Sequence, residues 1–519
     1  MRRSLLVLGA LTAVAWPASA AAAPVLVLGR DGHATLRNDR FVTEPAVTPA
    51  PSTPAPSTTV AARGRSQTAR GGERSYLRTS RAAGGAGLPK SSSTAKRRHR
   101  AHRHEPTFLS ELAGLYRRHR IGRATYLQAR GSFGSALRTE RRLRGTRRAE
   151  LSAVTETVHS IAVSHQLTPS RLPALIATLD ANRRWWSTGP LLSADQRVEI
   201  AGSQLVWEYY PGQGIQLQVL GTFGKADGLY TAGPSEYPAL QQLLSEMIPL
   251  ASRRGGGLTW EYYFNFDGGS PPWTSAMSQA TGLEALTRAY NATGNGWYLN
   301  VATRALPIFG DAPPVGVGVR TPAGTRFLQY TFAPDTRIIN AFLQTLIGLY
   351  DFAHASGNQT AAALFAAGNA QAQAEVPSFD TGAWSLYQPG IEDDLSYHEL
   401  VTGFLAQLCT RTSAPVYCTT ARHFQSDLKT PPVIVQRTLR ARTRSGFALR
   451  FTLSKVSHVG VLITRAGRTL FATSADFPYG THSFSIPRLR RPGSYGVVLT
   501  ATDLAGNFAR VTGNLTLRR

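Results

Sequence analysis

The sequence IINAFLQTLIGLYDF, residues 338–352, decides the fold class of the central part of this chain. Its apolar side chains recur every three to four residues, which is the period of an amphipathic α-helix. The same period recurs on both sides, between loops rich in Gly, Pro and aromatic residues. The other segments are 240–250, 276–290, 297–308, 361–374 and 397–408. Repeated helices joined by such loops predict a mostly helical fold, which we interpret as an incomplete α/α toroid.

The pattern changes on either side of these helices. Residues 108–186 continue the helical period, whereas residues 204–210 and 215–219 alternate around a Gly-rich turn and predict two strands near 200–223. After residue 432 the alternation is strict, with Phe447, Leu449, Phe451 and Leu453 on one face. We therefore predict a helical domain at residues 106–428 and a β-sandwich at residues 432–519. The sandwich resembles bacterial immunoglobulin-like modules in its closing hairpin.

Residues 1–23 predict a secretory signal peptide. They contain a basic start, an apolar stretch from Leu5 to Trp16 that is shorter than a membrane span, and a small-residue cleavage site at Ala18-Ser19-Ala20. Residues 24–105 are predicted to be a linker, in which Val25–Leu28 could form a strand and residues 43–105, rich in Pro, Ser and Arg, should be disordered. We expect an exported protein, secreted or attached to the envelope, without a membrane-spanning segment after signal removal.

The net charge of +26 is unevenly distributed. Residues 61–150 hold 23 basic and 5 acidic side chains, residues 432–519 hold 14 and 2, and residues 151–431 hold 15 and 21. The basic flanks either bind anionic cell-envelope polymers or reflect only an Arg-rich composition. Nucleic acid is the weakest alternative, because no helix-turn-helix, zinc-finger or RNA-binding aromatic motif accompanies the charge.

Two further features limit the chemistry. Cys409 and Cys418 are too few for a disulfide-built scaffold, and in an exported protein they predict one disulfide across a short loop. The chain has no Gly-x-Ser-x-Gly, no phosphate-binding Gly-rich loop and no His-Glu-x-x-His, and we expect no metal or other cofactor. The middle region is instead rich in loop tyrosines and tryptophans. Such rings stack on pyranose faces, so this composition is typical of sugar sites.

Four segments of the middle region form an ordered set. They are Tyr262-Tyr263-Phe264 with Pro272-Trp273-Thr274-Ser275-Ala276-Met277-Ser278-Gln279, then Gln329-Tyr330 with Asn340, then Phe379-Asp380-Thr381-Gly382 leading to Tyr387, and last Tyr397-His398. In order, spacing and residue type they resemble the C-terminal domain of D-glucuronyl C5-epimerases, over about residues 200–428. That resemblance supports a bowl-shaped helical domain that holds carbohydrate.

The resemblance implies an isomerase that inverts C5 of glucuronate residues in an acidic, heparan-sulfate-like polysaccharide. The proton removed lies α to a carboxylate, so the reaction needs a base on one face, an acid on the other and donors that stabilise an enediolate-like intermediate. By resemblance the catalytic group comprises Gln329, Tyr330, Tyr387 and Tyr397. The residues implied to contact the sugar are Tyr262, Tyr263, Phe264, Trp273, Ser275, Met277, Gln279, Asn340 and His398.

Three positions depart from the family pattern. Gln329 replaces a Glu, Gly390 replaces an Arg that follows the second tyrosine, and Val401 replaces the second His of Tyr-His-x-x-His. An amide cannot take a proton, and we expect Arg326 or Arg337 to replace the lost partner of the substrate carboxylate. Three functions therefore stay open: a C5-epimerase, a uronate lyase that begins with the same proton abstraction, and a non-catalytic envelope glycan-binding protein. A hydrolase is disfavoured because no pair of carboxylates stands out.

An acidic run, Glu392-Asp393-Asp394, comes shortly before Tyr397. Three carboxylates at this place would repel a polyuronate. The run is compatible with a uronate site only if one of its carboxyl groups acts as the proton carrier of the reaction.

Overall fold

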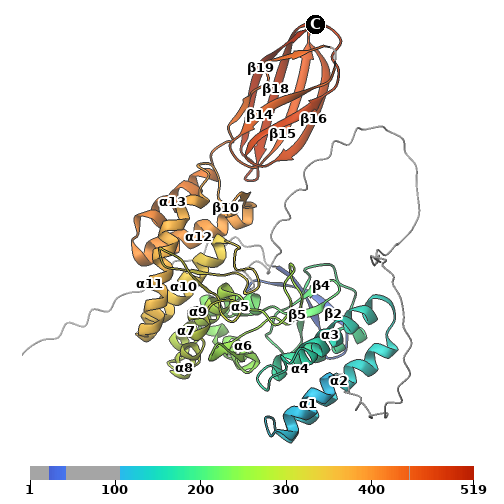
Figure 1. Ribbon diagram of the computed structural model, residues 1–519, viewed down its shortest axis with the longest axis vertical. Coiled ribbons are helices and arrows are strands. Elements are labelled where there is room, and N and C mark those ends of the chain that lie inside the picture. Colours follow the sequence, from blue (N-terminus) through green and yellow to red (C-terminus); the bar gives the residue numbers. More distant parts are fainter. Residues whose placement is uncertain (1–22, 42–105, 444) are drawn as a thin grey trace, which may run out of the picture. The chain divides into compact units, whose positions relative to one another are not determined.

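The computed structural model describes residues 23–41, 106–443 and 445–519 (Figure 1). The predicted signal peptide lies outside these residues except for Ala23. Residues 42–105, which make up most of the predicted linker, lie outside them as well. The signal peptide and the disordered segment therefore stay predictions.

An N-terminal sheet shows that the linker predicted for residues 24–105 begins too early. β1 (Ala23–Leu28) pairs antiparallel with β2 (Ala34–Asp39) and parallel with β3 (Arg197–Ile200). β4 (Trp207–Tyr210) and β5 (Gly214–Leu217) complete the order β2-β1-β3-β4-β5. The apolar side chains of Val25 and Leu28 become 0% and 2% exposed. They can be buried in this way because β3, far along the sequence, offers β1 a free edge.

A buried lysine ties this sheet to the helices. Lys225 of α5 (Val219–Thr231) places its Nζ 2.6 Å from Glu199 on β3 and 3.5 Å from Asp39 at the end of β2. Arg37 reaches the second oxygen of Glu199, at 2.7 Å. Burial costs an ion several kcal/mol unless it is paired. The two carboxylates therefore hold Lys225 in place, and Lys225 holds the β1–β2 hairpin against α5.

The first four helices confirm the helical period seen at residues 108–186. Their bounds are α1 (Phe108–Arg117), α2 (Arg123–Arg142), α3 (Gly145–Val163) and α4 (Leu172–Thr188). The side chain of Thr107 caps the first turn of α1. Leu112, Val154 and Leu175 are buried in one core with the rest of the helical body.

Nine further helices follow the N-terminal sheet in the described chain. They are α5, α6 (Tyr237–Met247), α7 (Ala276–Thr293), α8 (Trp297–Arg304), α9 (Pro307–Gly310), α10 (Ile339–Ser356), α11 (Gln359–Glu375), α12 (Leu395–Thr412) and α13 (Pro415–Asp427). α7 packs on α5 and α10, and α10 packs on α11 and α12. α10 crosses α7 closely because Gly348 has no Cβ to collide with the carbonyl oxygen of Ala280. This mixed helical and β architecture agrees with the predicted fold class, while the toroid stays a prediction.

Short irregular elements connect the helices and carry most of the sequence motifs. Three hairpins are formed by β6 (Ser252–Arg254) with β7 (Gly257–Thr259), β8 (Gly318–Arg320) with β9 (Thr325–Phe327), and β10 (Leu386–Gln388) with β11 (Ile391–Glu392). Single 3₁₀ turns lie at Pro234–Glu236, Ile248–Leu250 and Val376–Phe379. The predicted disulfide is confirmed, since Cys409 on α12 is bonded to Cys418 on α13.

The C-terminal residues form the two predicted sheets. The strands are β12 (Ile434–Gln436), β13 (Arg440–Arg442), β14 (Phe447–Leu453), β15 (Ser457–Arg465), β16 (Arg468–Phe477), β17 (Gly480–Ile486), β18 (Gly493–Asp503) and β19 (Phe508–Arg518). Their orders are β12-β14-β17 and β13-β19-β18-β15-β16, and they share a separate apolar core. This arrangement is compatible with an immunoglobulin-like sandwich. In the part of the chain that the structure describes, no helix has the length and apolar character needed to cross a bilayer.

We predict that Lys225→Met lowers the free energy of unfolding by about 3–5 kcal/mol, because it removes the buried cation that Asp39 and Glu199 share and leaves them only the exposed Arg37 as a partner. Arg40→Met is the matched control. Arg40 also joins the hairpin region to the helices, at 3.1 Å from Glu236, but its side chain is 71% exposed. That pair should contribute about 0–1 kcal/mol. Chemical denaturation followed by circular dichroism measures both, and equal losses would contradict the docking of the hairpin through Lys225.

Candidate functional site

Three tyrosines from separate segments meet in one cluster, which we call the tyrosine cluster: Tyr330, Tyr387 and Tyr397. Tyr330 lies in the loop after β9, Tyr387 lies in the middle of β10, and Tyr397 lies in the first turn of α12. The ring centroids of Tyr387 and Tyr397 are 5.2 Å apart, and the hydroxyl of Tyr330 hydrogen-bonds to that of Tyr387. The structure therefore brings together the three tyrosines singled out in the sequence.

The side-chain amide of Gln329, next to Tyr330 in the sequence, has a defined orientation. The hydroxyl of Ser275 donates to Gln329 Oε1 at 3.4 Å, which leaves the amide nitrogen to donate toward the Tyr330 oxygen. A chain of donors then runs from Gln329 through Tyr330 to the oxygen of Tyr387. Each donor in this chain stabilises negative charge on the next oxygen.

Several aromatic rings pack against Tyr330 and against one another, and we call them the aromatic layer. Trp273 stacks on Tyr262 with ring centroids 4.2 Å apart, and Tyr330 meets Trp273 edge-on at 5.7 Å and stacks on Phe332 at 5.2 Å. Phe264 packs edge-on against Trp273 in the same layer. All these rings except the partly buried Phe332 belong to the core. Tyr262, Phe264 and Trp273, which we expected to stack on sugar, are therefore packed against protein.

The remaining polar residues of the first motif are also engaged within the protein. Ser275 caps α7, and the amide of Gln279 bonds to both backbone groups of Trp260. The hydroxyl of Tyr263 donates to Glu261 at 3.0 Å. Met277 is buried in α7 and Asn340 in α10, and Asn340 Oδ1 has no hydrogen-bond partner among the described residues.

Burial sets the electrostatics of the cluster. Tyr330 and Tyr387 are only 2% and 4% exposed. Burial raises the pKa of Tyr330 and Tyr387 above the ordinary value, and the negative charge that the cluster tyrosines would impose on one another raises both further. Among the described residues, none of the main contributions to either shift comes from a basic side chain. Tyr330 and Tyr387 are therefore neutral at rest.

The side chain of His398 is fully buried. Its ring stacks on Trp384 with centroids 3.7 Å apart, its Nδ1 faces Ser385, and its Nε2 lies 3.0 Å from the carbonyl oxygen of Phe424. Burial lowers the pKa of His398 to about 4. Because both nitrogens are occupied and the ring is 0% exposed, a sugar cannot contact His398 in this conformation. The reasoning from sequence did not identify Ser385, which bridges His398 to Asp393.

The arginines expected to bind the substrate carboxylate are already paired. Arg326 donates to both oxygens of Glu375, and Arg337 lies 3.9 Å from the same carboxylate. Two arginines that the sequence did not single out, Arg171 and Arg254, line a groove of about 400 Å³ beside Trp273 and Phe332. Both bind Glu261, at 2.7 and 2.8 Å, so this triad carries one net positive charge. Arg171 comes before β3 and Arg254 comes after β5, so no local sequence motif contains both of them.

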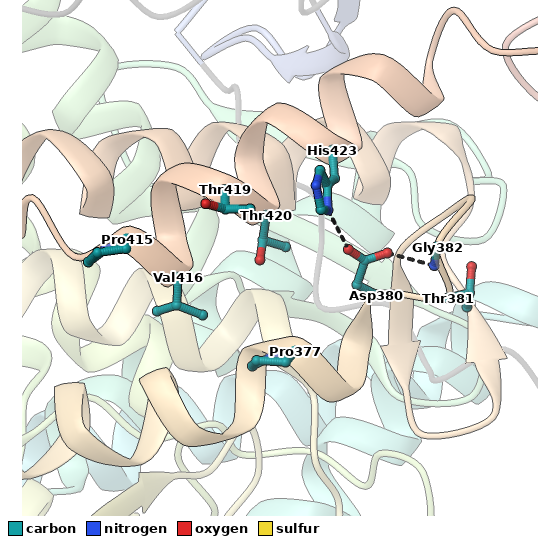
Figure 2. Close-up of a pocket in the computed structure, with 9 residues that line it drawn as sticks. All are labelled: Pro377, Asp380, Thr381, Gly382, Pro415, Val416, Thr419, Thr420 and His423. Carbon is teal, nitrogen blue, oxygen red and sulfur yellow. Dashed lines mark hydrogen bonds and ion pairs between the residues drawn. The ribbon is translucent and has the colours of Figure 1, made fainter.

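A larger groove, of about 730 Å³, lies between the turn at Asp380 and α13 (Figure 2). Figure 2 shows Asp380 accepting hydrogen bonds from the backbone nitrogen of Gly382 and from the ring of His423. No member of the tyrosine cluster lines this groove. The Asp380-Thr381-Gly382 motif therefore shapes the turn that leads into β10. Within the described residues, no group of three or more His, Cys, Asp or Glu side chains could hold a metal.

Comparison with known proteins supports the resemblance stated from the sequence. Residues 255–426 match the family described as the D-glucuronyl C5-epimerase C-terminus. A D-glucuronyl C5-epimerase of Caenorhabditis elegans is 31% identical over 130 residues, which are 22% of this chain and 21% of that protein. An uncharacterized protein of Methanocaldococcus jannaschii is 30% identical over 139 residues, which are 25% of this chain and 44% of that protein. The chain thus matches less than half the length of either relative.

Among solved structures, a cellobiose 2-epimerase from Bacillus thermoamylovorans B4167 aligns at 12% identity with a TM-score of 0.31, over 41% of this chain and 59% of that one. The family assignment for residues 255–426 is confirmed by the family match and the curated relative, and it lies within the range of about 200–428 expected from the motifs.

We predict that the His398 ring stays neutral until the pH falls to about 4, because burial opposes its charge. The unfolded chain takes up this proton at about pH 6.5, so the contribution of His398 to the free energy of unfolding is lost as the pH falls from about 6.5 to about 4. Proton NMR of the histidine rings measures the midpoint, with His398→Asn for assignment of the signal. A midpoint near 6.5 would place His398 in solvent, within reach of a sugar.

Proposed function

We propose that this protein is an exported carbohydrate epimerase of the D-glucuronyl C5 type, acting on uronate residues of an acidic polysaccharide. The observation that carries the proposal is the tyrosine cluster, in which Tyr330, Tyr387 and Tyr397 come together from three separate motifs. The family match at residues 255–426 supports the reaction class. Export, and contact of the basic flanks with anionic envelope polymers, are proposed from the sequence.

Tyr387 is the proposed base. Its oxygen lies at the end of the donor chain from Gln329 and Tyr330, which favours its tyrosinate form over that of Tyr330. The tyrosinate takes the proton from C5, and the C–H electron pair moves into the substrate carboxylate to give an enediolate. Tyr397, which is half-buried, then gives its hydroxyl proton to the opposite face of C5. Proton return from Tyr387 to Tyr397 resets the site, so each turnover inverts C5 without net proton transfer.

Tyr387 is neutral at rest, so its reacting tyrosinate form is a minor species. At pH values below the pKa of Tyr387, each increase of one pH unit raises the population of the tyrosinate about tenfold. The groove lined by Arg171 and Arg254 supports the choice of an acidic polymer, because the net charge of their triad with Glu261 attracts carboxylates. We propose that a neighbouring uronate of the polymer lies in this groove.

The burial of Tyr330 and Tyr387 favours a second candidate, a glycan-binding protein without turnover. Neither tyrosine exposes more than 4% of its surface, and Gln329, Gly390 and Val401 replace polar residues of the family pattern. A uronate lyase starts with the same proton abstraction but expels the glycosidic oxygen at C4 from the enediolate. These alternatives differ in their products, so one experiment separates them.

We expect the mature protein, incubated with a glucuronate-containing polymer in heavy water, to introduce deuterium at C5 and to form iduronate. Tyr387→Phe and Tyr397→Phe should each lower the exchange rate by about 10²- to 10⁴-fold, because each removes one acid or base. Tyr417→Phe is the matched control: it removes a buried hydroxyl that donates to Asn369 at 2.8 Å, outside the cluster. Proton NMR measures both products and rates.

Unsaturated chain ends would identify a lyase. Measurable binding without exchange on several polymers would support the glycan-binding candidate. Full activity in Tyr387→Phe would contradict the assignment of the base.

We predict that Gln329→Glu lowers the exchange rate and Gln329→Leu lowers it less. Glutamate would place a negative charge against Tyr330 and oppose the tyrosinate, whereas leucine only removes one donor. Initial rates of C5 exchange, compared at matched pH, measure the effect. A rate increase in Gln329→Glu would show that a carboxylate at position 329 itself accepts the C5 proton.

A further inference from the structure

The hairpin that carries Tyr387 is too short to fix itself in place. β10 and β11 form a two-stranded sheet of their own, and their paired positions lie on either side of Tyr387. Gly390 closes the turn between them with a φ of 84°, a conformation that favours glycine. An isolated two-stranded hairpin is only marginally stable in water. Contacts with other parts of the chain therefore have to set the position of Tyr387.

Glu392, the last residue of β11, makes one such contact with the C-terminal sheets (β12 to β19). Its Oε1 accepts a hydrogen bond from the backbone N–H of Val456 at 2.9 Å, and its Oε2 accepts one from the backbone N–H of Tyr479 at 2.7 Å. Val456 lies between β14 and β15, and Tyr479 lies between β16 and β17. Because an ionised acceptor strengthens both bonds, this one carboxylate holds two separate turns against the hairpin.

A second contact lies at the other end of the hairpin, where Trp384 precedes β10. The indole Nε1 of Trp384 donates to the carbonyl oxygen of Asp393 at 2.9 Å, which joins the residues on either side of the hairpin. The Nζ of Lys455, next to Val456, lies 5.2 Å from the centroid of the Trp384 ring. Trp384 is 0% exposed, so the C-terminal sheets help to bury the ring that closes the hairpin.

Lys455 is itself held firmly. It is 1% exposed, forms an ion pair with Asp503 of β18 at 2.6 Å, and donates to the backbone carbonyl oxygen of Asp427, the last residue of α13, at 2.7 Å. The side-chain amide of Asn507 also reaches this end of α13, where it donates to the carbonyl oxygen of Leu428 at 3.0 Å. A buried cation with such partners is costly to displace, so this lysine is a fixed point beside the hairpin.

We propose that Glu392 is a positioning residue for Tyr387, and that the C-terminal sheets take part in the reaction by holding the β10–β11 hairpin at both ends. The consequence for the reaction rests on the proposed function, whereas the contact of Glu392 with the two turns does not. We call that contact the Glu392 clamp.

The clamp matters because Tyr387 and Tyr397 belong to different elements. Their ring centroids are 5.2 Å apart, with Tyr387 on β10 and Tyr397 on α12. A shift of the hairpin therefore moves the proposed base relative to the proposed acid. A misplacement of about 1 Å can lower the rate of a chemical step about 10²-fold. The affinity for the polymer depends on many other contacts and should change little.

Glu392→Gln tests the clamp by kinetics. The amide keeps one acceptor oxygen but turns an NH₂ group toward the second backbone N–H, so it can hold only one of the two turns. We expect kcat for C5 exchange to fall about 10- to 100-fold, while KM for the polymer stays within about threefold of the native value. Initial rates at several polymer concentrations, measured by proton NMR in heavy water, separate the two constants.

Glu246→Gln is the matched control. Glu246 on α6 is half-buried, as Glu392 is, and its Oε1 also accepts a backbone N–H, from Gln204 at 3.2 Å. This variant removes the same charge away from the hairpin and should keep the native kcat and KM. A native kcat in Glu392→Gln, a rise in KM alone, or an equal loss of kcat in both variants would overturn the proposal.

Hydrogen exchange of backbone amides, measured by NMR, tests the clamp without a substrate and without a variant. The amides of Val456 and Tyr479 lie in turns, yet in the native protein both should be protected because they donate to Glu392. Exchange as fast as that of a solvated turn would overturn the proposal. In Glu392→Gln, the amides of β10 and β11 should exchange at least about tenfold faster than in the native protein, because the hairpin opens more often.

The two measurements also separate the clamp from the proposed function. Absence of C5 exchange on all polymers, together with protected amides at Val456 and Tyr479, would reject the proposed function and support the clamp. Deuterium entry at C5 with unprotected amides would support the function and overturn the clamp.

Discussion

The packing of Trp273 is the constraint on which the site depends. Its indole stacks on Tyr262, meets Tyr330 edge-on and donates from Nε1 to the carbonyl oxygen of Phe264 at 2.8 Å. These contacts join the segment between β7 and α7 to the loop after β9. Because close-packed interiors allow little adjustment, the position of Tyr330 is set by the aromatic layer. A change of ring size at Trp273 would therefore move one cluster tyrosine relative to the other two.

Burial has a second consequence, which is that the site is built from neutral groups. Tyr330, Tyr387, Gln329 and the neutral His398 all lie where an unpaired charge is costly. The charged groups nearby are paired instead, as Arg326 is with Glu375 and Arg171 with Glu261. A neutral interior beside a groove of net positive charge suits a reaction in which the substrate supplies the negative charge. The same interior limits that reaction to the small fraction of molecules that hold a tyrosinate.

The sequence predicted features that depend on local periodicity or on ordered motifs. The helix at residues 338–352, the alternation after residue 432 and the meeting of the three tyrosines are of this kind. Features that depend on a distant partner were missed. The pairing of Val25–Leu28 with β3 and the ion pair of Arg326 with Glu375 each join residues that lie far apart in the sequence. His398 was expected to contact sugar because a motif does not show how deeply a side chain is buried.

The departures from the family pattern have a common physical effect. A carboxylate in place of Gln329 would place a charge behind Tyr330, whereas the amide donates along the chain toward Tyr387. The acidic run before Tyr397 would reintroduce that charge if all its members were ionised. All three members are bonded within the protein: Glu392 accepts backbone hydrogen bonds from Val456 and Tyr479, Asp394 caps α12, and Asp393 accepts from the hydroxyl of Ser385. Burial raises the pKa of Asp393 to about 7, so the run carries less negative charge near neutral pH than three free carboxylates would.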